Sequence, residues 1–155
     1  MTTPPHEMHT ATLCLTVKSS VEAIDFYKKT FDAQELFKMT GPDGKSIMHA
    51  EVKIGDTIIM LGDEMPQMGC MSPQSVGGPS SGVYLYVSDV DTTIKKAGAN
   101  GAKILMPAID AFWGDRMGSI EDPFGHRWTI ATHIKDMTKE EISKAGQEWM
   151  KSMCK

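Results

Sequence analysis

The sequence has little cysteine, no excess of basic charge and no long hydrophobic run. Its three cysteines, Cys14, Cys70 and Cys154, are odd in number and far apart, which argues against a disulfide framework or a zinc cluster and favours reduced thiols. The formal net charge is −4, so the chain lacks the basic surface that a nucleic-acid partner requires. No apolar segment approaches the roughly 18 residues of a membrane span, so no membrane partner is expected.

The N-terminal segment MTTPPHEMHT has neither a basic start nor an apolar stretch, so we expect no secretory signal there. Together with the reduced cysteines, this favours a cytoplasmic location. Apolar residues make up 41% and charged residues 23%, which is typical of a globular protein. A chain of 155 residues can bury a core without disulfides or metal, and we expect one domain over residues 1–155.

An internal repeat with an offset of about 70 residues organises the chain. The segments TVKSSVEAIDFYKKTFDAQEL and YVSDVDTTIKKAGANGAKIL each show the pattern of a strand, a cap, a helix and a second strand, with Val17 matching Val87. Two further strand-like segments follow in each half. The repeat predicts two β-α-β-β-β modules, over about 8–62 and 81–133, joined by a Gly-, Pro- and Ser-rich mobile linker at 63–80. The expected fold class is α+β.

Local capping signals place the helices of both modules and of the tail. Ser19 or Ser20 caps the first helix, and Asp89 caps the second, which we expect to end at Gly98 or Gly101. A capping box of Thr138 and Glu141 predicts a C-terminal helix over about 138–153. This helix has an apolar stripe that must pack on the domain or on another subunit. The stripe consists of Ile142, Ala145, Trp149 and Met153.

Several phrases in order resemble a known family. The segments AIDFYKKTFDA, HAEVKIGDTIIMLGDE, WGDRMG, DPFGHRWTIATHI and TKEEI look like the PhnB-like branch of the vicinal oxygen chelate superfamily. This superfamily includes glyoxalase I, extradiol dioxygenases and bleomycin-resistance proteins. The resemblance implies that the two modules form a cupped mixed sheet around a cavity, and that the protein is a homodimer.

The same resemblance implies where a metal would bind in metal-dependent members. By position, the ligands fall on Thr12, Gly82 and Thr129, with a fourth near Ile59. None of these side chains is a carboxylate, an imidazole or a thiolate, so we expect no metal and no other cofactor.

A displaced divalent-metal site formed by His9, His49 and Glu51 is the alternative. His49 and Glu51 are two residues apart on a strand and therefore share a face. The competing interpretation is a polar outer face on a strand whose other side, including Met48, belongs to the core.

Strand alternation predicts which side chains face the cavity of such a fold. Cys14 shares a face with Thr12, the two tyrosines share a face with Gly82, and Thr129 joins them from the last strand. This neutral lining suits a planar or amphipathic organic ligand, although the same residues could equally fill the cup as packing. Cys14 is interpreted as a small buried apolar residue rather than a nucleophile. The predicted lining consists of Thr12, Cys14, Tyr84, Tyr86 and Thr129.

The segment WGDRMGSIEDPFGHRW carries two further candidates. Trp113 lies just before a strand and can line the mouth of a cavity, and Arg116 can hold an anion or stack on a planar ring. The alternative for Arg116 is a pair with Asp115, or another salt bridge, that fixes its loop. The DPFG sequence has Pro and Gly where a type I turn prefers them, so this part is interpreted as a hairpin turn.

Three functions remain open from the sequence. The leading hypothesis is a metal-independent protein that binds a small organic molecule. The second is a metal-dependent lyase, isomerase or dioxygenase that uses the displaced site. The third is a protein-interaction module that uses the C-terminal helix. No Ser-His-Asp or Cys-His pattern is visible, so no catalytic residue is assigned and enzymatic activity stays undecided.

Overall fold

The computed structural model describes residues 8–153, and Cys154 lies outside them. The chain divides into two compact units. Unit 1 is the chain up to Ser81 with the turn Asp122–His126 added, and unit 2 is Gly82–Glu121 with the chain from Arg127 onward. Within residues 8–153, no helix combines the length and apolar character needed to cross a membrane.

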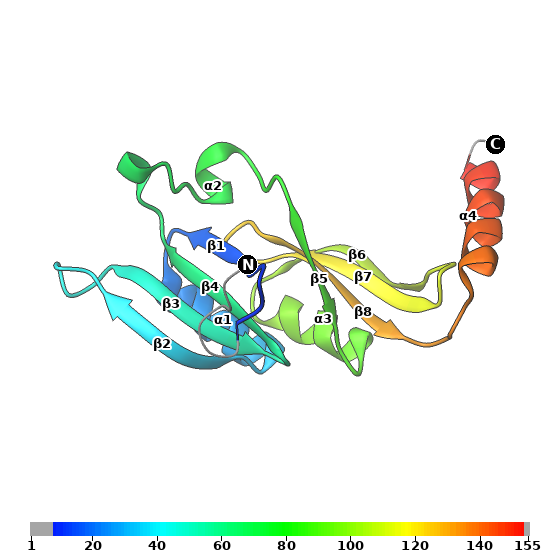
Figure 1. Ribbon diagram of the computed structural model, residues 1–155, viewed down its shortest axis with the longest axis horizontal. Coiled ribbons are helices and arrows are strands. Elements are labelled where there is room, and N and C mark those ends of the chain that lie inside the picture. The colour runs from blue at the N-terminus through cyan, green and yellow to red at the C-terminus, as the bar shows by residue number, and fades with distance from the viewer. Residues whose placement is uncertain (1–7, 154–155) are drawn as a thin grey trace. The chain divides into compact units, whose positions relative to one another are not determined.

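Unit 1 is a four-stranded mixed sheet with the strand order β1-β4-β3-β2. β1 runs parallel to β4, and the other neighbours are antiparallel (Figure 1). The elements are β1 (Cys14–Val17), α1 (Ser20–Phe31), β2 (Gln34–Thr40), β3 (Ile47–Ile54), β4 (Thr57–Asp63), the 3₁₀ helix η1 (Pro66–Met68) and α2 (Pro73–Val76).

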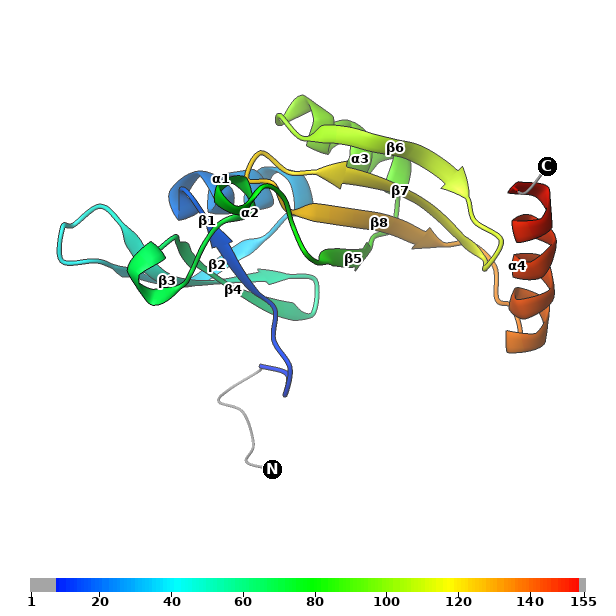
Figure 2. The ribbon, with the colours of Figure 1, turned by 90° about the horizontal axis from the view of Figure 1, so that it is seen from above.

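Unit 2 repeats the same plan, with the strand order β5-β8-β7-β6 and β5 parallel to β8. Figure 2 shows α3 along one face of these strands. The elements are β5 (Gly82–Tyr86), α3 (Val90–Ala99), β6 (Lys103–Asp110), β7 (Asp115–Glu121), β8 (Arg127–His133) and α4 (Lys139–Met153). The α+β class and the two β-α-β-β-β modules predicted from the repeat are therefore confirmed. The single-domain expectation stays a prediction.

The predicted caps form as expected. The Ser19 side chain accepts a hydrogen bond from the first turn of α1, and Asp89 does the same for α3. In the predicted capping box, the Thr138 amide donates to Glu141 at 2.7 Å, and the Glu141 amide donates to the Thr138 hydroxyl at 3.2 Å. α3 runs through Gly98 and ends at Ala99, so only the second of the two predicted glycine stops, Gly101, lies beyond the helix.

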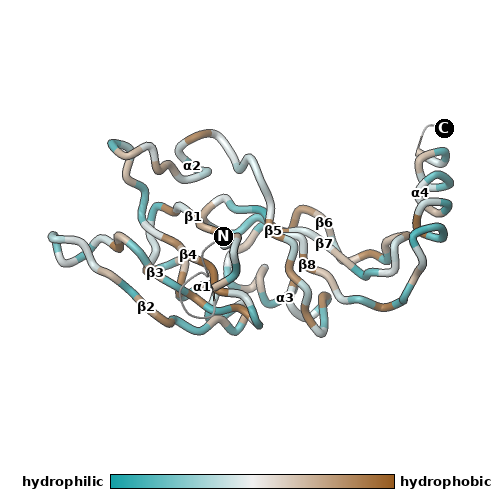
Figure 3. Tube along the Cα trace, viewed as in Figure 1, coloured by the Kyte–Doolittle hydropathy of each residue, from teal (hydrophilic) through white to brown (hydrophobic). Residues whose placement is uncertain are grey.

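The core of each unit lies between its helix and one face of its sheet. In unit 1 the apolar side chains of β3 point alternately to α1, and Figure 3 shows hydrophobic and hydrophilic residues alternating along this strand. In unit 2, Trp128, Ile120 and Ile130 are fully buried. Each of these side chains contributes roughly 1.5–3 kcal/mol through burial. The opposite face of each sheet is the open face and carries the more exposed side chains.

Met48 departs from the predicted pattern. It was expected in the core, but 43% of it is exposed. The pairing between β2 and β3 is irregular here. Met39 is opposite His49 and Thr40 is opposite Ile47, so no residue of β2 is paired with Met48. A bulge of this kind breaks the alternation on which the expectation rested.

Two short helices, η1 and α2, lie in the linker at 63–80, whose mobility stays a prediction. Pro66 and Pro73 each stand in the first turn of a short helix, where a missing backbone N–H costs no hydrogen bond. The Glu64 carboxylate accepts hydrogen bonds from the Ser72 amide at 3.0 Å and from the Ser75 hydroxyl at 2.8 Å. These bonds hold the start of α2, and they lower the pKa of Glu64.

The DPFG turn is a structural element of unit 1. Oδ1 of Asp122 accepts hydrogen bonds from the amides of Phe124 and His126, at 3.0 and 2.9 Å. Its other oxygen accepts the hydroxyl of Tyr27, from α1, at 2.9 Å. The ring of Phe124 packs edge-on against Tyr27. The turn interpretation accounts for these residues without assigning them chemistry.

Candidate functional site

Four side chains of unit 2 form hydrogen bonds with one buried carboxylate. Asp115 begins β7, is only 2% exposed, and accepts four hydrogen bonds. We call this group the Asp115 cluster. It consists of Asp115 with Tyr84, Tyr86, Trp113 and His133.

Three of the four donors are residues predicted as ligand contacts. The hydroxyls of Tyr84 and Tyr86 each donate to Oδ2 of Asp115 at 3.0 Å, and Nε1 of Trp113 donates to the same oxygen at 3.1 Å. Their position follows from local structure, because alternate residues of β5 share a face and Trp113 immediately precedes the turn into β7. Asp115 itself was considered only as a salt-bridge partner of Arg116.

The turn before β7 places Trp113. Gly114 has φ +97°, in the left-handed region that favours glycine. A β-carbon at this position would overlap the backbone oxygen of Lys135. The oxygen of Gly114 also accepts hydrogen bonds from the amides of Ile134 and Lys135, at 2.9 and 3.0 Å. The chain after β8 is thereby tied to the loop that carries the indole.

His133 completes the cluster and was not foreseen as a site residue. Its Nδ1 lies 2.9 Å from Oδ1 of Asp115, and its Nε2 lies 2.9 Å from Oδ1 of Asp136. Both ring nitrogens face carboxylates, so the arrangement favours the imidazolium, which donates from both. The hydrogen bond to Asp115, with that to Asp136, raises the pKa of His133.

The electrostatics of the cluster keep Asp115 ionised and both phenols protonated. Burial by itself would raise the pKa of Asp115, yet the four hydrogen bonds together hold it below its usual value. Desolvation, with the neighbouring carboxylate, raises the pKa of Tyr84 to about 12. The hydrogen bond to Asp115 raises the pKa of Tyr86. The tyrosines are therefore neutral donors rather than bases near neutral pH.

The tyrosine rings remain accessible although their hydroxyls are anchored. Tyr84 is 45% exposed and Tyr86 is 61% exposed. Their ring centroids are 5.2 Å apart, with planes inclined at 50°. Thr129 is paired with Tyr84 across β5 and β8 and is half-buried on the same open face.

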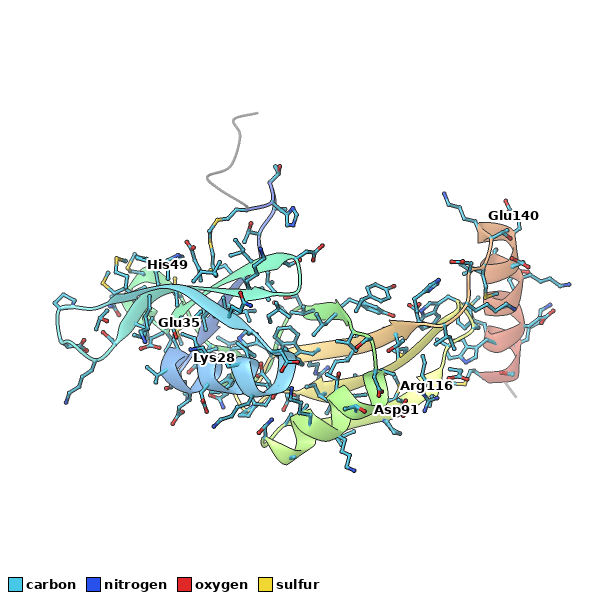
Figure 4. The ribbon with its side chains drawn as sticks, turned by 90° about the horizontal axis from the view of Figure 1, so that it is seen from below. Lys28, Glu35, His49, Asp91, Arg116 and Glu140 are labelled. Carbon is cyan, nitrogen blue, oxygen red and sulfur yellow. The ribbon has the colours of Figure 1, made fainter. Side chains whose placement is uncertain are left out.

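Arg116 lies on the opposite face of the same sheet. Its guanidinium makes a two-pronged ion pair with Asp91 at 2.7 and 2.9 Å, and a third bond to Asp110 at 2.8 Å. Figure 4 shows Arg116 beside Asp91, the second residue of α3. The pair with Asp91 raises the pKa of Arg116. The salt-bridge interpretation of this residue is the one that the contacts support.

Thr12 and Cys14 belong to unit 1. The Thr12 hydroxyl donates to the His9 carbonyl at 2.9 Å, just before β1. Cys14 is exposed, which corrects its interpretation as a buried residue, because its side chain lies on the open face of β1. Partial burial, together with the nearby Cys70, raises the pKa of the Cys14 thiol. A thiol with a raised pKa is a weak nucleophile at neutral pH.

The strand register refines the fourth family metal position. Tyr84 lies opposite Thr129, and the equivalent residue Cys14 lies opposite Met60. Met60, rather than the predicted Ile59, is thus the counterpart of Thr129, and Ile59 is buried in the core. Threonine, glycine and a thioether do not fit a divalent cation, so no step through such an ion is derived.

The displaced metal site does not gain a third ligand in the described residues. His49 and Glu51 do share a face, with Nε2 of His49 3.3 Å from Oε1 of Glu51. Within residues 8–153, however, no three His, Cys, Asp or Glu side chains are grouped to hold a metal ion. His9 is not brought into such a group with them.

Comparisons with known proteins give a consistent picture. A family model described as the Glyoxalase/Bleomycin resistance protein/Dioxygenase superfamily matches residues 8–130. The uncharacterized protein Mb0911c of Mycobacterium bovis is 41% identical over 134 residues, covering 84% of this chain and 88% of that protein.

Solved structures show the same fold. TioX from Micromonospora sp. ML1 has a TM-score of 0.59 and 25% identity, covering 80% of this chain and 99% of that chain. A PhnB protein from Bacillus cereus has a TM-score of 0.63 and 19% identity, covering 80% and 99%. The fosfomycin resistance protein FosX from Listeria monocytogenes, solved with Mn(II) and sulfate, has a TM-score of 0.63 and 16% identity, covering 86% and 95%. At such identities the last two share the fold alone.

Proposed function

The chain belongs to the Glyoxalase/Bleomycin resistance protein/Dioxygenase superfamily, and from that premise we propose that it is a metal-independent protein that binds a small organic molecule. The ligand lies on the open face of the unit 2 sheet, against Tyr84 and Tyr86. One observation carries this proposal: two exposed aromatic rings are held by hydroxyls that donate to a single buried carboxylate.

Anchored rings are suited to ligand binding for an energetic reason. A flexible aromatic side chain loses rotamer freedom when it immobilises a ligand, and this loss weakens binding. The hydrogen bonds to Asp115 restrict both tyrosines before any ligand arrives. An exposed and preorganised aromatic pair favours stacking on planar surfaces, as in other small-molecule sites.

The indole of Trp113 offers a direct test. Its N–H donates to Asp115, so its ¹H–¹⁵N resonance reports on the cluster and can be assigned with a Trp113→Phe variant. We expect planar organic compounds to shift this resonance in a saturable manner, and Tyr84→Ala with Tyr86→Ala to abolish the shift. The proposal fails if no planar compound shifts the Trp113 resonance in the folded protein.

Helix α4 favours a second function, that of a protein-interaction module. None of the 15 residues of α4 is buried. Trp149, Met150 and Met153 are 50%, 56% and 69% exposed. Phe112 contacts the helix, with its ring centroid 5.7 Å from that of Trp149. A helix of this length is marginal in water without packing.

This second function predicts a change in assembly. If α4 joins two copies of the chain, Trp149→Ala should shift the mass measured by light scattering from dimer to monomer. Lys144→Ala, on the same helix but polar, is the matched control and should leave the mass unchanged. A monomer for both the parent chain and the variants would remove the support for an α4-mediated homodimer.

A further inference from the structure

The two tyrosines of β5 form an exposed aromatic pair, here called the notch. Their hydrogen bonding differs from that of ordinary surface tyrosines. Because Tyr84 and Tyr86 alternate on one strand, both rings face the open side of the sheet. Each hydroxyl proton is committed to Oδ2 of Asp115 at 3.0 Å. A ligand therefore meets the exposed rings of these tyrosines rather than a free phenolic donor.

Ring faces of this kind attract positive charge. An aromatic ring carries a quadrupole with its negative part on the face, and cations bind over it. Sharing the phenolic proton with a carboxylate increases the electron density of the oxygen and the ring. Tyr84 is 45% exposed and Tyr86 is 61% exposed, so a bound group can reach both side chains.

The charges around the notch favour a cation as well. Two carboxylates, Asp115 and Asp136, flank the imidazole of His133, so these three groups carry at least one net negative charge even when His133 is protonated. The nearest arginine on the open face, Arg127, is paired with Glu121 at 3.7 Å, and Arg116 points to the opposite face. A bound anion would thus meet negative charge without an unpaired arginine to offset it.

Lys135 and Lys103 do not offset the negative charge near the two tyrosines. Lys135 follows His133 by two residues, but its charge acts on Glu141 of the α4 capping box. Hydrogen bonds with Thr138 lower the pKa of Glu141, and the charge of Lys135 adds to this effect. Lys103 is at the far end of β6, opposite Glu121. The field at the notch is therefore set by the Asp115 cluster and Asp136.

We propose that the open face of unit 2 selects planar organic cations, such as amidinium, guanidinium or N-alkylated heteroaromatic groups, over neutral and anionic molecules of the same shape. This inference rests on the proposed function and names the ligand class of that site. The cation stacks on the exposed rings of Tyr84 and Tyr86.

Three probes of nearly equal shape test the charge preference. Benzamidine, benzamide and benzoate share one planar ring and carry positive, zero and negative charge near neutral pH. Titration followed by the Trp113 indole resonance should give a dissociation constant for benzamidine at least about fivefold below that of benzamide, a difference of about 1 kcal/mol. Benzoate should bind most weakly. Equal or tighter binding of benzamide or benzoate overturns the inference.

Two variants test whether benzamidine binds at the tyrosines. Tyr86→Ala should weaken benzamidine binding at least about fivefold, or about 1 kcal/mol. Ile104→Ala removes an exposed apolar side chain on the α3 side of the same sheet and should leave binding unchanged. Unchanged benzamidine binding in Tyr86→Ala also overturns the inference.

The failure of this inference is distinguishable from the failure of the proposed function. If neutral planar compounds shift the Trp113 resonance as strongly as cations, only the charge preference is wrong. If none of the three probes and no other planar compound shifts it, the ligand face itself is wrong, and the inference falls with it.

Discussion

The Nδ1 atom of His133 lies 2.9 Å from Oδ1 of Asp115, at the end of β8 and the start of β7 respectively. The other ring nitrogen is engaged by Asp136, in the segment that leads to α4. One imidazolium thus joins a buried carboxylate of the sheet to the connection beyond it. Loss of the His133 charge would therefore weaken both contacts, the one to Asp115 and the one to Asp136.

The first prediction concerns the pH dependence of stability. The pKa of His133 is raised in the folded protein, so its stabilisation is complete below about pH 6.5 and is lost as pH rises through the folded value. The temperature of the unfolding midpoint should therefore decrease as the pH rises from about 6.5 through the folded pKa of His133. His133→Gln should flatten this part of the profile. A profile that is identical in the variant would contradict the assignment.

The second prediction concerns the charge of Asp115. Asp115→Asn replaces one carboxylate oxygen with an NH₂ group, so at least one part-buried donor loses its acceptor. We expect a loss of about 2 kcal/mol or more in the free energy of unfolding, measured in urea. Asp110→Asn is the control, since its exposed pair with Arg116 contributes less than about 1 kcal/mol. Equal losses for both variants would show that the cluster is not cooperative.

Asp115 also predicts how stability changes in acid. The pKa of Asp115 is lowered in the folded protein, so its stabilisation is present above the unfolded value of about 3.9 and is lost as pH falls through the folded value. Asp115→Asn should therefore lose less stability than the parent chain when the solution is acidified. Parallel acid unfolding curves would argue against this.

The third prediction concerns Gly114. A β-carbon there meets the carbonyl oxygen of Lys135, and the backbone has φ +97°. Gly114→Ala should destabilise the protein by about 2 kcal/mol or more and should displace the Trp113 indole resonance. Gly44→Ala is matched in having a positive φ but meets nothing within 4 Å, so it should cost only about 1 kcal/mol. A smaller effect at Gly114 than at Gly44 would contradict this account of the turn.

The fourth prediction concerns the buried hydroxyl of Tyr27. Tyr27→Phe removes the donor to Asp122 and should lower the free energy of unfolding by about 1–2 kcal/mol. Thr57→Ala removes an exposed hydroxyl with a neighbouring carboxylate partner, Asp56, and should change it by less than about 0.5 kcal/mol. Denaturant titration of the three proteins gives the comparison. A neutral Tyr27→Phe would show that the hydroxyl does not stabilise the turn.

The sequence by itself determined the module plan and the helix starts of this protein. Alternation along β1 and β5 and the 3.6-residue stripes of the helices come from the chain's own periodicity. The caps at Ser19, Asp89 and Thr138 depend on bonds to residues three positions away, so local sequence is sufficient to predict them. The family assignment followed from the order of several short phrases.

Only the tertiary structure decided how the candidate site is assembled. The tyrosines that reach Asp115 are 31 and 29 residues away in the chain, and His133 is 18 residues away, so no local pattern links them. The register of β5, β8 and β7 brings them together. The sequence signal for Asp115 is its position at the start of a strand, directly after Trp113 and Gly114. The adjacent Arg116 instead suggests a simple ion pair.

The same reason explains what the sequence did not reveal about Met48 and Arg116. Met48 was assigned to the core because alternation was extended through a bulge that sequence does not reveal. Arg116 was assigned to a ligand because its partners, Asp91 and Asp110, lie on α3 and at the end of β6. Periodicity determines which residues share a face of one strand, whereas pairing across strands and packing of a helix decide which of those side chains meet.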